Sequence, residues 1–367
     1  MAGLIGGVKL DAAVIKAAAP VALMSLGAPQ PGPDAMQLQN VTFDRNKHFT
    51  VGDGDPRTPY SRRKTESKLA VKWGQFKLLM EEVQFFNLYW DPSKVPRPVV
   101  VYVGSATGTH IAVLADMFPW FTFHLHDPRE HDPILKGNKN IHIHKGFFND
   151  EEAKVYAERK DVFLIVDIRS TTYKRNENVS TAEAKENEAI VASDMDKQMA
   201  WTRIIRPVKA SLKFRLPYSW DFVKAQGKTR AYLDGLVYLQ QWGPVTTTET
   251  RLVPHDDLRM RDWDYQAHEE MMFHHNTKVR AVQAFLNPIT GSDGAVAPKM
   301  GLLSDYDSVA TTVITMEYLE KFGVKPTQET VLPLLKEMIR GAAKGATTLF
   351  GLRVGSKSAT ADDDDND

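Results

Sequence analysis

The chain has 367 residues, of which 43% are hydrophobic and 25% are charged, and this composition is typical of a globular protein and excludes disorder throughout. The absence of cysteine excludes a disulfide scaffold, a thiolate metal site and a cysteine nucleophile. Lys and Arg together number 46, as do Asp and Glu, so bulk charge predicts no nucleic-acid partner, and any such site must come from local clusters. No apolar run is long enough to span a bilayer, so no membrane partner is expected.

Composition divides the chain into four parts. Residues 1–56 carry scattered proline and glycine and are expected to form a flexible N-terminal arm. A main domain is expected over 57–290, followed by a helical extension over 291–353 that packs on the same domain. Residues 354–367 end in a nearly continuous acidic run and are expected to be a disordered tail.

The periodicity of apolar residues predicts helices and strands in alternation. Apolar residues recur every three or four positions over 68–90, which predicts a helix, and a β-branched run over 99–103 predicts a buried strand. Further helices are predicted over 109–117, 150–159 and 181–203, and further strands over 121–125, 140–144, 162–166 and 210–214. Two strand-like runs, 235–241 and 245–253, predict an antiparallel pair, and the pattern after residue 262 is mostly helical.

This alternation is typical of βαβ units, in which each helix crosses over to the next parallel strand. The predicted fold class is therefore α/β: a doubly wound, Rossmann-like sheet that is mostly parallel, has an antiparallel pair at one edge and carries helices on both faces.

A glycine turn follows the first strand of this predicted sheet. Gly104 and Gly108 bracket the turn, and glycines there let a ligand approach the backbone closely. The spacing matches neither the Gly-x-Gly-x-x-Gly pattern of dinucleotide-binding proteins nor a Walker loop. Asp127 follows the second strand, where an acid can hold ribose hydroxyls; its alternative role is to form the turn before Pro128. Because both features lie at carboxyl ends of adjacent strands, we favour ligand binding.

Four charged residues stand in apolar surroundings: Lys77, Asp167, Lys213 and Glu249. A charge inside an apolar strand is costly unless it is paired or functional. Any one of them alone is explained by a surface position or a structural ion pair, so the set gains its weight from the segments around it.

Those segments resemble the poxvirus cap-specific mRNA nucleoside 2′-O-methyltransferases. The matching segments, in the order of that family, are GQFKLL (74–79), VVYVGSATGTH (100–110), HDPIL (131–135), DIRS (167–170), SLKFR (211–215) and ETRL (249–252). Thr107 stands where that family has proline. The resemblance covers about residues 68–280 and implies a Rossmann-like methyltransferase fold for the main domain.

The resemblance also implies a catalytic tetrad and a cofactor. The tetrad would be Lys77, Asp167, Lys213 and Glu249, with Lys213 as the general base. The cofactor would be S-adenosyl-L-methionine, held by Gln75, Tyr102, Gly104, Ser105, Ala106, Gly108, His110, Asp127, Arg129, Phe148 and Asp167. No metal is expected, since the histidine pairs of the sequence have no carboxylate-rich motif beside them.

General chemistry agrees with this implication. A ribose hydroxyl is a poor nucleophile at neutral pH, so a base must take its proton as the methyl group arrives. A lysine serves as that base when desolvation and a neighbouring cation favour its neutral form. Lys213 lies in a predicted buried strand, and the family places Lys77 nearby.

Capped mRNA is the partner that the resemblance implies. A cationic methylated guanine stacks on aromatic side chains, and the resemblance assigns these cap contacts to Tyr60, Tyr218, Asp221 and Glu269. Arg169, Lys174 and Arg175 lie in or next to the polar loop after Asp167, and these basic side chains are expected to contact RNA phosphates, with a solvated charged face as the alternative. The family has a second acid just after the aromatic residue that Tyr218 matches; here Trp220 and Asp221 both stand at that place, and which of the two serves stays open. Without the resemblance, Tyr218 and Trp220 would be assigned to the core.

Two alternatives stay open. A 2′-O-methyltransferase without cap selectivity would keep the tetrad and need no aromatic slot. A non-catalytic processivity subunit of a viral poly(A) polymerase is the other, because the poxvirus family also has that role. A dehydrogenase is disfavoured by the incomplete glycine pattern. The expected location is the host cytoplasm, in viral factories, and in addition the virion.

Overall fold

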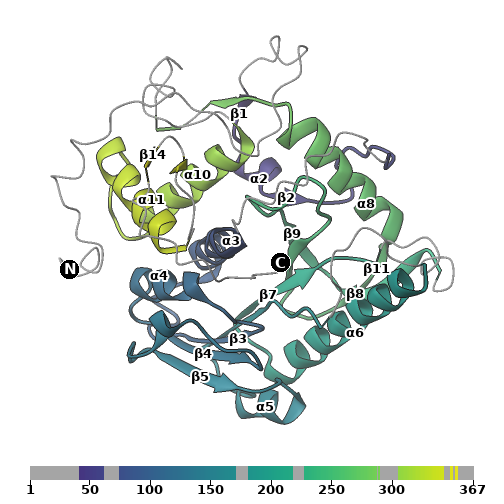
Figure 1. The fold of residues 1–367 in the computed structure, drawn as a ribbon, viewed down its shortest axis with the longest axis horizontal. Coiled ribbons are helices and arrows are strands. Elements are labelled where there is room, and N and C mark those ends of the chain that lie inside the picture. The colour runs from purple at the N-terminus through teal and green to yellow at the C-terminus, as the bar shows by residue number, and fades with distance from the viewer. Residues whose placement is uncertain are drawn as a thin grey trace.

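The computed structural model describes residues 41–61, 74–170, 181–217, 227–286, 288–289, 305–342, 348–349 and 352–353. Its centre is an eight-stranded sheet in the order β2-β9-β10-β7-β6-β3-β4-β5 (Figure 1). In that order the strands are β2 (Thr50–Val51), β9 (Gly235–Tyr238), β10 (Thr250–Pro254), β7 (Lys209–Phe214), β6 (Val162–Val166), β3 (Val99–Val103), β4 (Thr122–Asp127) and β5 (Ile141–Lys145).

The sheet is mostly parallel. Strands β5, β4, β3, β6 and β7 pair in parallel, whereas β10 is antiparallel to both β7 and β9, and β2 is antiparallel to β9. The C-terminal ends of the five parallel strands therefore lie at the same end of the sheet, which we call its carboxyl edge. Because β10 is antiparallel to β7, it begins there. This order confirms the predicted α/β class with an antiparallel part at one side.

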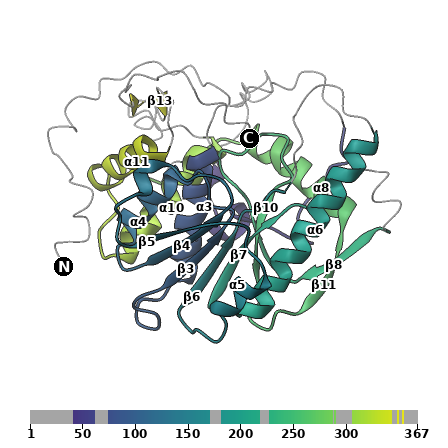
Figure 2. The ribbon, with the colours of Figure 1, turned by 60° about the horizontal axis from the view of Figure 1, so that its bottom comes forward.

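Helices cover both faces of the sheet (Figure 2). One face is covered by α3 (Gly74–Tyr89), α4 (Thr109–Met117), α10 (Tyr306–Lys321) and α11 (Gln328–Ala342), and the other by α5 (Asp150–Val155) and α6 (Thr181–Ile205). Each face has its own hydrophobic core: the first core lies under α3, α4, α10 and α11, and the second core lies under α5 and α6. Successive strand residues point to opposite faces, so Tyr102 of β3 lies in the first core and Val103 in the second. The central strands β3 and β6 are thus buried on both faces, as strands of a covered parallel sheet are.

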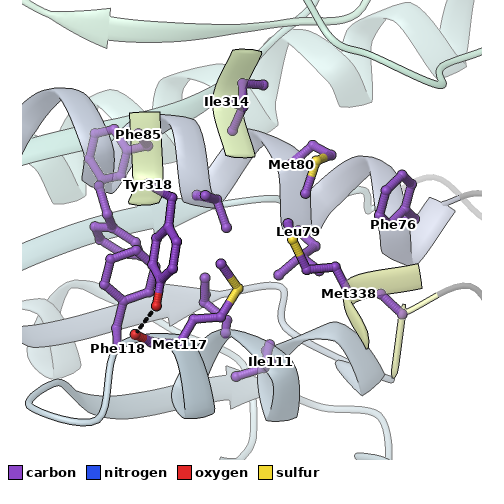
Figure 3. Close-up of a cluster of buried hydrophobic side chains, with 14 of the residues drawn as sticks. Phe76, Leu79, Met80, Phe85, Ile111, Met117, Phe118, Ile314, Tyr318 and Met338 are labelled. Atoms are coloured by element: carbon purple, nitrogen blue, oxygen red, sulfur yellow. Dashed lines mark hydrogen bonds between the residues drawn. The ribbon is translucent and has the colours of Figure 1, made fainter. Parts of the chain in front are cut away.

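The first core joins segments that are far apart in the sequence. Leu79 and Met80 of α3 pack with Ile111 of α4 and with residues of α10 and α11 (Figure 3). The Tyr318 hydroxyl donates to the carbonyl of Met117 at 2.8 Å. The two C-terminal helices therefore pack on the same domain as α3 and α4.

Smaller elements surround the sheet. They are β1 (Val41–Thr42), α2 (Arg45–His48), η2 (Pro133–Leu135), β8 (Thr229–Leu233), β11 (Met260–Asp264), α8 (Tyr265–His274), the π-helical segment η3 (His275–Arg280), β12 (Phe285–Leu286), β13 (Thr348–Leu349) and β14 (Leu352–Arg353). None of the described helices combines the length and apolar composition needed to cross a bilayer.

Two features differ from the sequence expectations. Residues 41–51 belong to the fold instead of to an arm, because β2 pairs with β9 and Phe49 is buried in the first core. The antiparallel ladder of β8 with β11 was not expected, since half of its side chains are exposed and the sequence shows no apolar alternation there. Residues 1–40 and the acidic tail lie outside the described residues.

Candidate active site

The four charged residues singled out in the sequence meet at the carboxyl edge of the sheet. Asp167 follows the last residue of β6, and Lys213 lies in β7. Glu249 precedes β10, which pairs with β7 so that Arg251 stands opposite Lys213. Lys77 comes from the first turn of α3. Four separate elements thus supply one cluster, which we call the tetrad.

Ion pairs join the tetrad into one network. The Lys213 Nζ lies 3.0 Å from Asp167 Oδ1 and 3.4 Å from Glu249 Oε2. The other oxygen of Glu249 accepts from Lys77 Nζ at 2.9 Å. Two ammonium groups therefore share one carboxylate.

Two arginines extend this network. Arg169 Nη2 lies 3.2 Å from Glu249 Oε2. Arg251 donates from Nη2 to Asp167 Oδ1 at 2.8 Å and from Nε to a carboxylate oxygen of Glu81. Arg251 and Glu81 were not identified from the sequence; the available signal for Arg251 was a charge two residues after Glu249 in an apolar strand.

The electrostatics follow from burial against charge. Burial by itself raises the pKa of Asp167 and of Glu249. Neighbouring cations hold both pKa values below the ordinary range: Arg251 and Lys213 act on Asp167, and Lys213 and Lys77 act on Glu249. Burial by itself lowers the pKa of Lys77, yet the Glu249 carboxylate and its neighbours raise it overall. Both tetrad carboxylates are therefore ionised at neutral pH.

The glycine turn lies beside the tetrad, directly after β3. Gly104 has a φ of +82°, and a Cβ there would lie 2.6 Å from the carbonyl oxygen of Asp167. Gly108 has a φ of +77°, and a Cβ there would lie 2.6 Å from the carbonyl oxygen of Ser105. Both positions require glycine, because an L side chain is strained and blocked at each of them.

Asp127 fastens this turn to the end of β4. Its Oδ2 accepts from the backbone N–H of Ala106 at 3.0 Å, and its Oδ1 accepts from the backbone N–H of Arg129 at 2.9 Å. The Arg129 guanidinium also reaches the Ala106 carbonyl at 2.7 Å. Asp127 is thus next to the turn, as expected, and also holds its shape.

The other residues assigned to the cofactor are mostly inward-facing. Gln75 Oε1 lies 2.7 Å from His110 Nδ1, and His110 Nε2 lies 3.0 Å from Glu82. Ser105 pairs with His131, at 2.8 Å from Oγ to Nε2. Tyr102 is fully buried in the first core, and Phe148 packs edge-on against Trp201 in the second. Most of these side chains are therefore buried and contact other protein groups.

Of the residues assigned to RNA, the structure describes three. Tyr60 is half exposed and packs edge-on against Phe273 of α8. Glu269 lies one turn before Phe273 on that helix, and burial raises its pKa. Arg169 belongs to the tetrad network. Tyr218, Asp221, Lys174 and Arg175 lie outside the described residues. Within the described ranges no group of three or more histidine or carboxylate side chains is arranged to hold a metal ion.

Comparison with known proteins identifies relatives of this chain. The sequence model of a family described as "Poly A polymerase regulatory subunit" matches residues 49–318. Among curated proteins, the "Cap-specific mRNA (nucleoside-2'-O-)-methyltransferase" of Myxoma virus (strain Lausanne) is 30% identical over 208 residues, which are 53% of this chain and 56% of that protein. The protein of the same description from Fowlpox virus (strain NVSL) is 28% identical over 270 residues, 69% of this chain and 77% of that protein.

The match to the myxoma relative covers a little over half of that protein's length. Among solved structures, the human methyltransferase 10 domain containing protein aligns with a TM-score of 0.30 and 12% identity, covering 52% of this chain and 83% of that chain.

Proposed function

Because the chain belongs to the Poly A polymerase regulatory subunit family, we propose that it is a cap-dependent mRNA 2′-O-methyltransferase that takes its methyl group from S-adenosyl-L-methionine. The acceptor is the ribose 2′-hydroxyl of the first transcribed nucleotide. Two relatives with this description, from Myxoma virus and Fowlpox virus, support the reaction class.

One observation carries the proposal. The Lys213 ammonium group lies between Asp167 and Glu249 at the carboxyl edge of the sheet, next to the glycine turn. Ligands of doubly wound folds bind at that edge. A lysine held there by two carboxylates is fixed in position at the edge where a ligand's hydroxyl would lie, and its Nζ would take the proton of that hydroxyl.

The residues present fit the proposed cofactor. Gly104 and Gly108 let the turn adopt positive φ values and pack closely against backbone carbonyls, and Asp127 fixes that turn at the end of β4. We propose that the cofactor lies against this turn, with its ribose on the side of Asp127. When bound, it supplies a methyl group activated by a sulfonium centre.

The residues of this chain then manage the proton. Lys213, in its neutral form, accepts the proton of the 2′-hydroxyl at Nζ as the oxygen becomes methylated. Asp167 and Glu249 orient Nζ and stabilise the ammonium group that forms. Lys77 keeps Glu249 in place from the other side.

Recognition of the cap is proposed for the aromatic and acidic residues near α8. Tyr60 and Tyr218 would stack on the methylated guanine, and Glu269 and Asp221 would read its edge. Arg169, Lys174 and Arg175 would contact the RNA phosphates.

Three short RNAs test this proposal. Each is incubated with labelled S-adenosylmethionine: one with an N7-methylated guanine cap, one with an unmethylated cap and one without a cap. We expect transfer to the first RNA about 5- to 30-fold above the others, because stacking of a cationic ring contributes roughly 1–2 kcal/mol. Equal transfer to all three identifies an RNA 2′-O-methyltransferase without cap selectivity, and no transfer to any of them excludes the enzyme.

A second function is favoured by the description of the family. The chain would then be a processivity subunit of a viral poly(A) polymerase, acting in the cytoplasm of the host cell. Poly(A) tail length made by the poxvirus-type catalytic subunit, with and without this chain, tests that role. A tail length that does not change would exclude it.

A further inference from the structure

Glu81 is a buried carboxylate that no sequence pattern assigned to the active site. It lies four residues after Lys77 in α3, so the two side chains project from the same side of the helix. Glu81 is only 7% exposed, and one of its oxygens accepts from Arg251 Nε. Burying a carboxylate this deeply costs free energy of desolvation, which only a favourable interaction with its partner can offset.

The contact with Arg251 connects Glu81 to the proposed base through three consecutive ion pairs. Arg251 uses its other end, Nη2, to donate to Asp167 Oδ1 at 2.8 Å. The same oxygen is 3.0 Å from Lys213 Nζ. A continuous path thus runs from α3 through β10 and the end of β6 to β7.

We propose that Glu81 is a positioning residue of the methyl-transfer site: it fixes the Arg251 guanidinium from the side opposite Asp167 and so holds Asp167 and Lys213 in register. The inference rests on the proposed function. The contacts to Asp167 and to the Val166 carbonyl hold only the Nη atoms, whereas a carboxylate on Nε also restrains rotation of the guanidinium plane about the Cδ–Nε bond. Arg251 Nη1 also lies 3.4 Å from the Val166 carbonyl. Glu81 is the carboxylate that contacts the guanidinium from the α3 side.

The remaining oxygen of Glu81 faces a small cavity. Glu81 Oε1 and Gln84 Nε2 are both buried, and neither has a hydrogen-bond partner among the described residues. Both residues line the cavity, together with Arg251 and Ser211, and its volume of about 10 Å³ has room for one water molecule. A water there would bridge Glu81 and Gln84 and keep the carboxylate hydrogen-bonded while Arg251 is held.

Other charged and titratable groups face Glu81 and Arg251 from every neighbouring element. They are Lys77 of α3, Tyr102 of β3, Asp167 after β6, Lys213 of β7 and Glu249 before β10. Loss of the negative charge of Glu81 therefore makes the cluster more positive and favours the neutral form of its lysines.

Two variants separate positioning from simple stabilisation. Glu81→Leu removes charge and hydrogen bond, and we expect kcat to fall at least about tenfold while the KM for capped RNA stays within about twofold. Glu81→Gln keeps a hydrogen-bonding oxygen, and we expect the rising limb of its kcat–pH profile to move to lower pH by about half a unit or more. Asp307→Asn is the matched control, because it breaks another buried carboxylate–arginine pair, with Arg280; it should lower stability and leave both readouts unchanged.

A measurement without catalysis completes the test. The side-chain N–H signal of Arg251 Nε, assigned by its loss in Arg251→Lys, should exchange with solvent at least about tenfold faster in Glu81→Leu than in the wild type. If exchange and the pH profile match those of the wild type, Glu81 has no positioning role. If the wild type transfers no methyl group, the proposed function fails, and the exchange measurement alone decides whether Glu81 anchors Arg251.

Discussion

Asp167 Oδ1 is the atom on which the charged residues of the site converge. It accepts from both Lys213 Nζ and Arg251 Nη2, while Glu249 holds Lys77 and Lys213 on its two oxygens. Removing one partner from such a buried network leaves an uncompensated charge, which costs far more than the pair contributes. Conservative substitutions that keep the charge are therefore the informative ones.

Lys213→Arg keeps the positive charge, but the arginine cannot lose its proton at working pH and so cannot act as a base. We expect turnover to fall by about a hundred- to ten-thousand-fold, the range of general-base loss. Binding of S-adenosylmethionine, measured by calorimetry, should stay within about twofold. Lys209→Arg at the start of the same strand, where the lysine pairs with Asp256, should retain full activity. Near-normal turnover of Lys213→Arg would remove that lysine from the role of base.

The sequence located some of these residues and missed others for a physical reason. Lys213 and Asp167 stand out because a charge in or directly after an apolar strand needs an explanation. Glu81 does not, since an acid four residues after a lysine on a helix predicts an exposed ion pair. Its true partner, Arg251, is 170 residues away in the chain, and only the assembled sheet brings them together.

Helix α3 joins the chemistry of the site to the packing of the first core. One side of it carries Lys77 and Glu81, and the other side carries apolar residues such as Phe86. The Phe86 ring is fully buried and packs edge-on against Phe121 and Phe118, with ring centroids 4.9 and 5.3 Å apart. Packing of this ring therefore fixes the helix that presents Lys77.

Phe86→Ala should lower the free energy of unfolding by about 3–5 kcal/mol, since a ring of this size leaves a cavity that the core cannot fill. Urea unfolding followed by circular dichroism measures the change. Leu88→Ala on the same helix serves as the control, because Leu88 is 48% exposed, and its cost should be within about 0.5 kcal/mol. Equal costs for the two variants would contradict this assignment of the core.

Strands that are buried on both faces were predictable from the sequence. The run over 162–166 coincides with β6, and that over 99–103 with β3, because a short, unbroken apolar run rich in β-branched residues favours a buried strand. Strand β2 has only two residues and no periodicity, so its place beside β9 comes from tertiary pairing.

At the scale of the whole molecule, burial keeps several histidines neutral. Burial lowers the pKa of His126 to about 3, that of His268 to about 4 and that of His275 to about 3. In the unfolded chain each of them titrates near 6.5. Between these values the unfolded state binds more protons than the folded state, so stability rises with pH.

Acidification from pH 7 to pH 5 should therefore destabilise the protein. Below pH 6.5 we expect each of these histidines to reduce the free energy of unfolding by about 1.4 kcal/mol per pH unit. Urea unfolding at four pH values measures the slope. His126→Gln replaces one titrating group at the position that contacts the Tyr156 hydroxyl. It should lower the dependence of the free energy of unfolding on pH by the contribution of one histidine, about 1.4 kcal/mol per pH unit. Stability that does not change over this range would refute the linkage.

During translation, α3 and α4 are synthesised well before α10 and α11, the helices that pack on them. The hydrogen bond from Tyr318 to Met117 spans 201 residues, and a ribosome adds about 5–20 residues per second. Roughly 10–40 s therefore pass between the synthesis of α4 and the arrival of the helices that cover it. Throughout that interval the apolar sides of α3 and α4 face the solvent on the ribosome, where molecular chaperones bind such surfaces. Slower translation lengthens this exposure, and faster synthesis of the last third of the chain shortens it.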